Sequence, residues 1–464
     1  MFVNRKYELG VLEKRYISEK PELFIIYGRR RVGKTELIRH FIKSRPHIYY
    51  LADLRSEREQ LEIISTLLGD YFGDNIIKDN PLKNWELVFR YIFSKLTDNE
   101  KFILVLDEFQ YLAEISPSLP SVIQKVWDGY LKNKNIFLLL CGSSMSFMEK
   151  QVLSYKSPLY GRRTGQLEVF QFDFFQLNEM LPKLDTEELI NFSAVFGGVP
   201  AYLELADQSK SLWKNIEEQI FPQDRILNNE VNFLLMQELR TPKNYFLILR
   251  AIALGRTKIN DIVQLTGLER GLVGKFLDNL MELRIVERNV PVTENPQNSR
   301  KGIYAISDNY FRFWFRFIYP HLTYLAEGKT KYILDIIKKD FVVFLGSVYE
   351  DICLSYLRKD TGIFPFNLIK IGKYWEKKIE IDIVGLDESG ENIVIGECKF
   401  SNKKIGTNII EDLKNKSAAL QRSAQNFNYI LFSKSGFTED MIKYARAERI
   451  QLIDLSFTPY FDKF

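Results

Sequence analysis

An octapeptide of the form GxxxxGK followed by Ser or Thr most constrains the fold of this chain. Gly28–Thr35 has this pattern, an apolar run at Leu23–Tyr27 precedes it, and an amphipathic segment at Glu36–Ser44 follows. A strand that ends in a glycine-rich loop and continues into a helix presents backbone N–H groups and a helix N-terminus to a phosphate. The segment therefore predicts a phosphate-binding loop within an α/β domain.

The residue types in this loop indicate a nucleoside triphosphate bound with magnesium. We expect Lys34 to reach the β- and γ-phosphates, where it would act in catalysis, and Thr35 to ligate Mg²⁺. The other residues expected to contact the nucleotide are Gly28, Arg29, Arg30, Arg31, Val32, Gly33 and Glu36. ATP and Mg²⁺ are therefore the cofactors that the sequence predicts.

A second apolar run, Phe102–Leu106, delivers the carboxylates of Asp107 and Glu108. Ligands of open α/β sheets bind at the carboxyl ends of the strands, so both acids would lie beside the loop. We expect Asp107 to hold magnesium, directly or through water, and Glu108 to polarise the attacking water. An ordinary strand that ends in solvated acids is the alternative interpretation of this segment taken alone.

Two further groups of residues could contact the γ-phosphate. Ser143 and Ser144 follow the apolar run Ile136–Cys141, and a polar residue at that strand end could sense the phosphate. A turn rich in Gly and Ser explains them equally well. Arg162 and Arg163 could stabilise the charge of the transferred phosphate, in cis or from a neighbouring subunit of a homo-oligomer. Solvated surface arginines are the alternative.

Length and composition bound the class of protein. A chain of 464 residues is too long for one ordinary core and should form about three domains. Its 46% hydrophobic and 27% charged residues are typical of a soluble protein, and a net charge of +4 gives no global signal for nucleic acid. The cysteines, Cys141, Cys353 and Cys398, are far apart, which favours a reducing, cytoplasmic compartment. We find no apolar stretch long enough to span a membrane.

Changes of pattern along the chain predict its division into domains. Apolar runs that alternate with amphipathic segments indicate a buried, mostly parallel sheet over residues 1–185. A helical segment interrupted by Gly197–Pro200 follows over residues 186–240. Residues 241–325 have the pattern of a winged helix-turn-helix, and residues 333–464 that of a second, mixed α/β domain.

The predicted winged helix offers a modest basic surface. Its helices are expected at Lys243–Gly255, Ile259–Thr266 and Glu269–Leu283, with a wing between Ile285–Pro291 and Gly302–Ile306. The basic residues expected to face DNA are Arg270, Lys275, Arg284, Arg300 and Lys301. Glu269 and Asp278 dilute this charge, so contact with DNA and a role as a lid or protein contact both stay open.

The C-terminal domain carries a second acidic pattern. Two strands predicted to be neighbours could place Asp382 and Glu397 on the same side, with Lys399 on the same face as Glu397. Two acids and a lysine can bind magnesium and position a water for phosphodiester hydrolysis. Glu350, in a helix predicted at Phe344–Leu357, could complete the acidic set. A hairpin with solvated charges is the alternative.

The N-terminal half resembles the prokaryotic family often called archaeal-type ATPases, within the AAA+/STAND-like P-loop group. The segments that carry the resemblance are Phe2–Arg5, Gly28–Thr35, Leu106–Gln110 and Gly197–Pro200. The resemblance implies that Asn4 and Arg5 lie near the nucleotide base. It also implies that Pro200 packs on adenine from a helical lid. A plain helix break is the alternative for the last segment.

The C-terminal domain resembles the PD-(D/E)xK nuclease superfamily over about Phe344–Phe400, although Ile381 stands where a proline would precede Asp382. The resemblance implies that Asp382 and Glu397 are metal ligands and that Lys399 acts in catalysis. The sequence thus predicts a Mg²⁺-dependent ATPase that acts on DNA, with a nuclease-like domain that binds or cleaves nucleic acid. The alternative is a nucleotide-dependent switch or scaffold whose C-terminal parts bind protein partners without catalysis.

Overall fold

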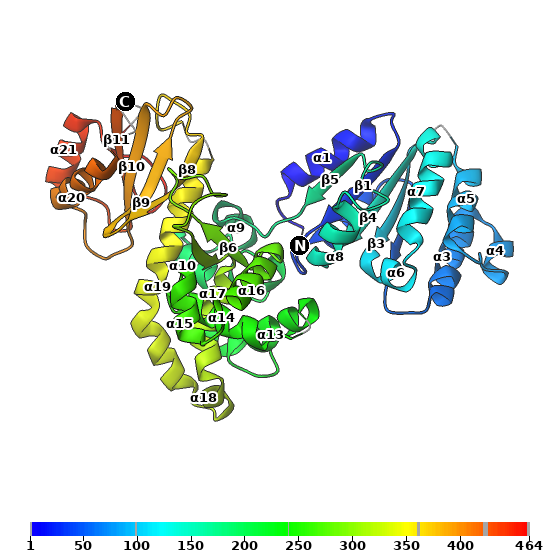
Figure 1. Ribbon diagram of the computed structural model, residues 1–464, viewed down its shortest axis with the longest axis horizontal. Helices are drawn as coiled ribbons and strands as arrows, with labels where there is room; N and C mark the ends of the chain where they lie inside the picture. The colour runs from blue at the N-terminus through cyan, green and yellow to red at the C-terminus, as the bar shows by residue number, and fades with distance from the viewer. Residues whose placement is uncertain (1, 98–99, 240, 360–361, 421–425, 462–464) are drawn as a thin grey trace. The chain divides into compact units, whose positions relative to one another are not determined.

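The computed structural model describes residues 2–97, 100–239, 241–359, 362–420 and 426–461 (Figure 1). Its internal contacts divide the chain into two compact units. Unit 1 comprises residues 1–171 together with Val199–Ala201, and unit 2 comprises residues 172–198 and 202–464. The division of unit 2 into a lid, a winged helix and a nuclease-like domain stays a prediction.

Unit 1 is built on a parallel sheet of five strands in the order β2-β3-β4-β1-β5 (Figure 1). The strands are β1 Glu22–Tyr27, β2 His47–Leu51, β3 Phe102–Asp107, β4 Ile136–Gly142 and β5 Gly165–Glu168. Every residue of β1, β3 and β4 is buried, as the continuous apolar runs predict. Because all the strands are parallel, their carboxyl ends meet at one edge of the sheet.

Helices between the strands cover this sheet. The longer ones are α1 Lys6–Ile17, α2 Lys34–Ile42, α3 Glu57–Phe72, α5 Trp85–Lys95, α6 Phe109–Ile115 and α7 Leu119–Gly129. Short turns of helix are α4 Asn75–Asp79, η1 Leu131–Asn133, α8 Met145–Phe147 and η2 Met148–Leu153. Leu37 and Phe41 of α2 bury their side chains in one core cluster with Phe24 and Phe137 of the sheet. This packing fixes α2, and therefore the loop before it, against the sheet.

The first part of unit 2 is helical. It contains α9 Phe174–Met180, α10 Thr186–Phe196, α12 Leu212–Asn215, η3 Ile216–Ile220 and α13 Ile226–Glu238. A short helix, α11 Pro200–Leu203, begins at the predicted helix break. Asp185 caps α10 in a reciprocal capping box with Glu188, which explains why the helix starts where it does.

The middle of unit 2 has the element order expected of a winged helix. Three helices, α14 Lys243–Ala253, α15 Ile259–Thr266 and α16 Arg270–Glu282, precede two antiparallel strands, β6 Val286–Asn289 and β7 Ile303–Ile306. Val273, Leu277 and Leu280 are buried on one face of α16, at the i, i+4 and i+7 spacing of an apolar helix face.

The chain then continues through helices into a single long one. These are α17 Asn309–Phe313, η4 Trp314–Ile318, η5 Tyr319–His321, α18 Leu322–Ala326 and α19 Thr330–Arg358. The predicted boundary at residue 333 therefore falls inside α19. Its buried residues, among them Ile337, Phe344 and Ile352, run along its whole length, so packing rather than a sequence break decides where this helix begins.

A mixed sheet completes unit 2, in the order β12-β11-β10-β9-β8 (Figure 1). Its strands are β8 Lys370–Glu376, β9 Ile379–Leu386, β10 Asn392–Lys399, β11 Asn426–Ser433 and β12 Gln451–Ile453, with α20 Thr407–Ser417, η6 Ala418–Leu420 and α21 Glu439–Glu448. Strands β8 to β10 pair antiparallel, and β10 to β12 pair parallel. The predicted α/β class, with a parallel sheet and a separate mixed sheet, is confirmed.

Across the described parts of the chain, every helix is too short or too polar to cross a membrane.

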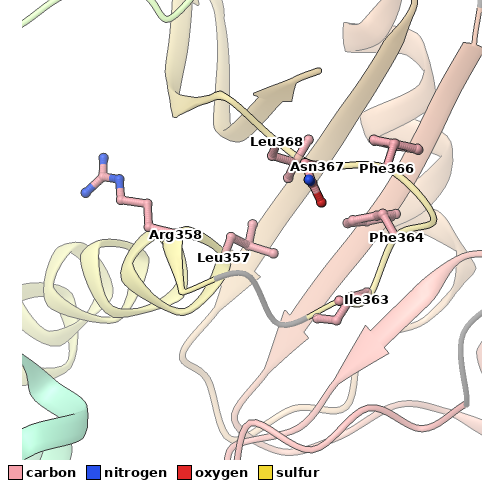
Figure 2. A pocket seen from close by; sticks show the side chains of 8 residues that line it. Leu357, Arg358, Ile363, Phe364, Phe366, Asn367 and Leu368 are labelled. Carbon is pink, nitrogen blue, oxygen red and sulfur yellow. The ribbon is translucent and has the colours of Figure 1, made fainter. Parts of the chain in front are cut away.

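A cavity of about 180 Å³ lies in unit 2, lined by Leu357, Arg358, Gly362, Ile363, Phe364, Phe366, Asn367 and Leu368 (Figure 2). The guanidinium of Arg358 points away from the apolar side chains that face the cavity in Figure 2.

Candidate functional site

The loop Gly28–Thr35 joins β1 to α2 at the carboxyl edge of the parallel sheet. A Cβ atom added to Gly28 would lie 2.3 Å from the carbonyl oxygen of Val169, so the main chain leaves no room for a side chain there. Gly33 has a φ of 90° and forms the N-cap of α2. These two positions explain why the pattern requires glycine at both.

Lys34 lies inside the curve of this loop. Its Nζ donates hydrogen bonds to the carbonyl oxygens of Gly28 and Arg29, each at 2.8 Å. The side chain is buried, and this burial lowers the pKa of the Lys34 ammonium below its ordinary value. A buried ammonium bound only to carbonyl oxygens can exchange these acceptors for the oxygens of a phosphate.

Thr35 and Asp107, the two residues predicted to hold magnesium, are in direct contact. Thr35 Oγ1 donates to Asp107 Oδ2 at 3.0 Å. The main-chain N–H of Glu108 donates to Oδ1 of the same carboxylate at 2.9 Å. Asp107 is almost fully buried. A hydroxyl and a carboxylate at this separation are oxygen ligands of the kind that Mg²⁺ prefers.

Tyr49 of β2 is a member of this site that the sequence did not reveal. Its hydroxyl donates to Asp107 Oδ2 at 2.6 Å. Burial, and then the charge of Asp107, raise the pKa of Tyr49 above its ordinary value, so the phenol keeps its proton. The only signal for Tyr49 in the sequence is its hydroxyl group within a short apolar strand. This signal does not indicate which residue lies beside the hydroxyl.

Glu108 meets Ser143 at the ends of β3 and β4. Ser143 Oγ donates to Glu108 Oε2 at 2.6 Å, and Gln110 Nε2 donates to the same oxygen. Gln110 Nε2 also donates to Ser143 Oγ at 3.2 Å. The structure thus brings together the predicted water-polarising acid and one predicted phosphate sensor. In the sequence, Gln110 was identified only as part of a segment that carries the family resemblance, and no role was predicted for it.

The other residues expected near the nucleotide lie around the loop. Arg5 is buried, and its Nη2 donates to the carbonyl oxygen of Val32 at 2.6 Å while Nη1 pairs with Glu8. The amide N–H of Arg5 donates to Asn4 Oδ1. Arg30 donates to the hydroxyl of Tyr111 at 3.1 Å. The Arg5 side chain therefore supports the loop by binding the main chain of Val32. A contact of Arg5 with the nucleotide base stays a prediction.

Pro200 lies close to the loop. A Cβ atom built on Gly33 would be 4.0 Å from Pro200 Cγ, and residues Val199–Ala201 belong to unit 1 by their contacts. Arg31 and Glu36 are exposed at the start of α2. Contact of any of these residues with adenine or phosphate stays a prediction.

Arg162 and Arg163 are not brought to the loop within this chain. Both precede β5, whose first residue, Gly165, pairs with Phe24 near the start of β1, so they lie toward the opposite edge of the sheet. Arg162 pairs with Asp128 at 3.0 Å, and Arg163 donates to the carbonyl oxygen of Leu153 at 2.7 Å. These positions fit surface arginines, and a role in a neighbouring subunit stays a prediction.

A second cluster of charged residues lies in unit 2 and is called the acidic centre below: Glu350, Asp382 and Glu397, with Lys399. Asp382 Oδ2 accepts a hydrogen bond from the main-chain N–H of Cys398 at 2.9 Å. Burial, and then the charges of Glu350 and Glu397, raise the pKa of Asp382 to about 7. Strands β9 and β10 therefore hold the two predicted ligands close enough to influence each other.

Lysines neutralise the other acids of this centre. Glu397 Oε1 pairs with Lys399 at 2.5 Å, and Oε2 lies 3.6 Å from Lys416 of α20. Glu397 Oε2 is buried and accepts no hydrogen bond from the described residues. Glu350 pairs with Lys373 of β8 at 2.6 Å. Neither Lys373 nor Lys416 was predicted, because both come from elements other than the two strands that carry Asp382 and Glu397.

Glu350 does not complete a cluster of three acids with Asp382 and Glu397, and the predicted pair of acids with Lys399 stays a prediction. Within the residues that the structure describes, no three or more His, Cys, Asp or Glu side chains are grouped so that they could hold a metal ion. Lys373 offers a physical reason. Although burial lowers its pKa, Asp351 and Glu350 raise the pKa above its ordinary value, so Lys373 stays charged and occupies the place beside Glu350 that a cation would take.

The predicted wing is held against β8. Val292 N–H donates to the carbonyl oxygen of Lys373 at 3.0 Å, and Trp375 Nε1 donates to the carbonyl oxygen of Lys301 at 3.1 Å. The Lys301 ammonium pairs with Glu294 and Glu376 at 2.7 and 3.1 Å. Arg270, Lys275, Arg284 and Arg300 are exposed. The predicted basic surface therefore loses Lys301 to neighbouring acids.

Comparison with known proteins gives two family matches. The model for an ATPase domain predominantly from Archaea matches residues 2–206. The model described as archaeal and bacterial proteins of unknown function matches residues 314–415. The first match covers the loop, the acid pair and Pro200, and the second covers Glu350, Asp382 and Glu397.

Individual relatives and a solved structure are also similar to this chain. An uncharacterized protein of Methanocaldococcus jannaschii is 36% identical over 413 residues, which are 87% of this chain and 88% of that protein. An uncharacterized ATP-binding protein of the same organism is 25% identical over 286 residues, 51% of this chain and 76% of that protein. The Walker-type ATPase of Pyrococcus abyssi has a TM-score of 0.49 at 22% identity, and the match covers 68% of this chain and 96% of that one.

Proposed function

This chain belongs to the family of ATPases found predominantly in Archaea, and we propose that it uses Mg²⁺-dependent ATP hydrolysis to act on DNA through a C-terminal domain that binds or cleaves nucleic acid. That it is an ATP-binding P-loop ATPase follows from the family. The observation that supports turnover is the direct contact of Thr35 with Asp107, beside Lys34 and Glu108.

Each residue of the nucleotide site has a separate task in this proposal. Lys34 exchanges the carbonyl oxygens of Gly28 and Arg29 for phosphate oxygens. Thr35 and Asp107 would hold a magnesium ion, which would neutralise phosphate charge.

Glu108 orients the water that attacks. Among the described residues, the hydrogen bonds to its carboxylate come from Ser143 and Gln110, and both use Oε2. Oε1 can therefore accept a proton from the water. Fixing one carboxylate oxygen while the other faces the reaction is how a side chain is kept in a productive orientation.

The acidic centre supports the nucleic-acid part of the proposal. Glu397 Oε2 is a buried carboxylate oxygen that accepts no hydrogen bond from the described residues, and such an atom favours binding of a further positive group. Lys399 and Lys416 beside it can contact a phosphodiester. Asp382 and Glu397 remain the predicted ligands of a divalent cation, which would require Lys399 or Lys416 to move away.

The test uses the full chain and two kinds of DNA, a supercoiled plasmid and a linear duplex, with Mg²⁺ or Mn²⁺ and with or without ATP. We expect binding in every case and cleavage that Asp382→Asn abolishes. Binding that persists without any cleavage would restrict the domain to a binding role. If DNA does not bind at 50 mM salt (low ionic strength, which favours phosphate contacts), the DNA proposal fails while ATP hydrolysis stands.

A nucleotide-dependent switch or scaffold is the second candidate. Two observations favour it: Lys301 of the predicted wing is paired with acids, and Leu265 and Leu272 expose apolar side chains on α15 and α16. Exposed apolar side chains suit a protein partner better than a phosphate backbone. Hydrolysis without DNA affinity, together with ATP-dependent capture of a protein through α16, would support this candidate.

A further inference from the structure

The hydroxyl of Tyr49 and the carboxylate of Asp107 form one of the shortest contacts in the nucleotide site, at 2.6 Å. We infer that Tyr49 is a positioning residue of the magnesium site: it fixes the orientation of the Asp107 carboxylate. The inference rests on the Mg²⁺-dependent ATPase function proposed above. It adds a residue from β2, a strand that carries no part of the phosphate-loop motif.

The fold holds the phenol ring of Tyr49 in place. Strand β2 lies next to β3, and Leu51 pairs with Asp107 across the two parallel strands. Tyr49, two residues earlier on the same face of β2, packs against the core cluster of unit 1. The guanidinium of Arg39 lies 5.5 Å from the centre of its ring. A ring held on both sides can aim its hydroxyl in one direction.

The two oxygens of Asp107 then have different surroundings. Oδ1 accepts from the main-chain N–H of Glu108, which is part of the chain and cannot rotate away. Oδ2 accepts from both Thr35 and Tyr49. The Thr35 hydroxyl can ligate an ion through a lone pair while its proton stays on Oδ2, so its orientation would depend on the ion. Tyr49 is not a predicted ligand, and its hydroxyl orients the Asp107 carboxylate whether or not an ion is bound.

The adjacent residue provides a matched control. Tyr50 follows Tyr49 in the same strand, points to the other side of the sheet, and donates its hydroxyl to Gln60. Tyr50→Phe removes one hydroxyl and one hydrogen bond from β2, as Tyr49→Phe does. Only Tyr49→Phe removes a donor from Asp107.

The experiment measures binding of a fluorescent ATP analogue and ATP hydrolysis by the full chain across a titration of MgCl₂. We expect Tyr49→Phe to raise the half-saturating Mg²⁺ concentration about tenfold, the usual effect of removing a partner that orients a metal ligand. Nucleotide affinity in EDTA should stay unchanged. Tyr50→Phe should leave the Mg²⁺ dependence as it is, and thermal unfolding should show that both variants fold.

A double-mutant comparison tests the route of the effect. In an Asp107→Asn background, Tyr49→Phe should cause no further change in the Mg²⁺ titration, because the group that it positions has been altered. An unchanged titration for Tyr49→Phe, or an equal shift for Tyr50→Phe, overturns the inference and leaves the proposed ATPase intact. If the natural chain itself shows no Mg²⁺-dependent nucleotide binding, both the inference and the proposed Mg²⁺ site are refuted.

Discussion

In the nucleotide site of unit 1, the carboxylates of Asp107 and Glu108 accept hydrogen bonds from hydroxyl and amide groups, whereas in the acidic centre of unit 2 the carboxylates of Glu350 and Glu397 pair with lysines. A neutral donor carries no charge that opposes an arriving cation. An ammonium must be displaced against its own charge pairing. The first site is therefore arranged to receive a cation, and the second is already neutralised.

This difference bears on what each site can bind. The nucleotide site has an excess of negative charge at Asp107 and Glu108, and its nearest ammonium, Lys34, is held by carbonyl oxygens. In the acidic centre, Lys373, Lys399 and Lys416 oppose three acids. A phosphate that draws a lysine away from Glu397 would at the same time free that acid for a cation. Binding of a nucleic acid and of a metal would then be coupled in unit 2.

The largest expected effect concerns Glu108. Glu108→Gln keeps the hydrogen bonds from Ser143 and Gln110 possible but removes the charge that polarises water. Turnover should fall by about 10²–10⁴-fold, the range for a general base, while ATP binding persists. A radiolabelled ATP hydrolysis assay beside an equilibrium binding assay measures both. The control is Glu114→Gln, an exposed acid on α6, and full turnover in Glu108→Gln would remove the assigned role.

The next effect tests whether a lysine neutralises the acidic centre. Lys373→Met leaves the Glu350 carboxylate partly buried without its cation, which should lower the free energy of unfolding by about 2 kcal/mol, less than for a fully buried pair. Urea denaturation followed by calorimetry or fluorescence measures this change. Adding Glu350→Gln should restore most of the loss. Equal stability of Lys373→Met and the natural chain would show that the pairing does not matter.

A smaller effect is expected from pH. The pKa of Asp382 is about 7 in the folded chain, above the value near 4 of an unfolded aspartate, so the folded state holds the extra proton between these values. The contribution of Asp382 to stability is therefore complete below about pH 4 and is lost as the pH rises to about 7. Asp382→Asn should unfold at a higher temperature than the natural chain at pH 8, with a smaller difference at pH 5. An identical pH dependence in both proteins contradicts this assignment.

The smallest effect concerns the predicted DNA surface. If α16 contacts phosphates, Lys275→Gln should weaken duplex binding uniformly and reduce the salt dependence of the affinity by about one counterion. Lys301→Gln should change neither, because Glu294 and Glu376 already neutralise this lysine. Fluorescence anisotropy over a salt series measures both variants. A larger loss for Lys301→Gln than for Lys275→Gln would reverse this ranking.

The sequence predicts the nucleotide site better than the acidic centre for a physical reason. Gly28, Lys34 and Thr35 lie in one continuous segment, so their spacing alone determines their geometry. Asp107 ends a strand whose apolar run is unmistakable. Tyr49 and Gln110 also belong to the site, but their contacts depend on which strands become neighbours, and periodicity does not determine that.

Every contact of the acidic centre likewise depends on which elements become neighbours in the fold. Lys373 and Lys416 come from β8 and α20, on either side of the strands that carry Asp382 and Glu397. The alternation of β9 correctly places Asp382 beside β10. It does not reveal that lysines from flanking elements will occupy the space around the acids. The prediction therefore described the strands that carry the acids but not the lysines that pair with them.

Lys373 also connects two parts of unit 2, the loop between β6 and β7 and the helix α19. Its carbonyl oxygen accepts the N–H of Val292 from the loop between β6 and β7, and its ammonium pairs with Glu350 on α19. A partner that lifted this loop off β8 would pull on the main chain of the same residue that supplies the counter-charge of Glu350. Movement of this loop would therefore alter the ion pair of Lys373 with Glu350 in the acidic centre.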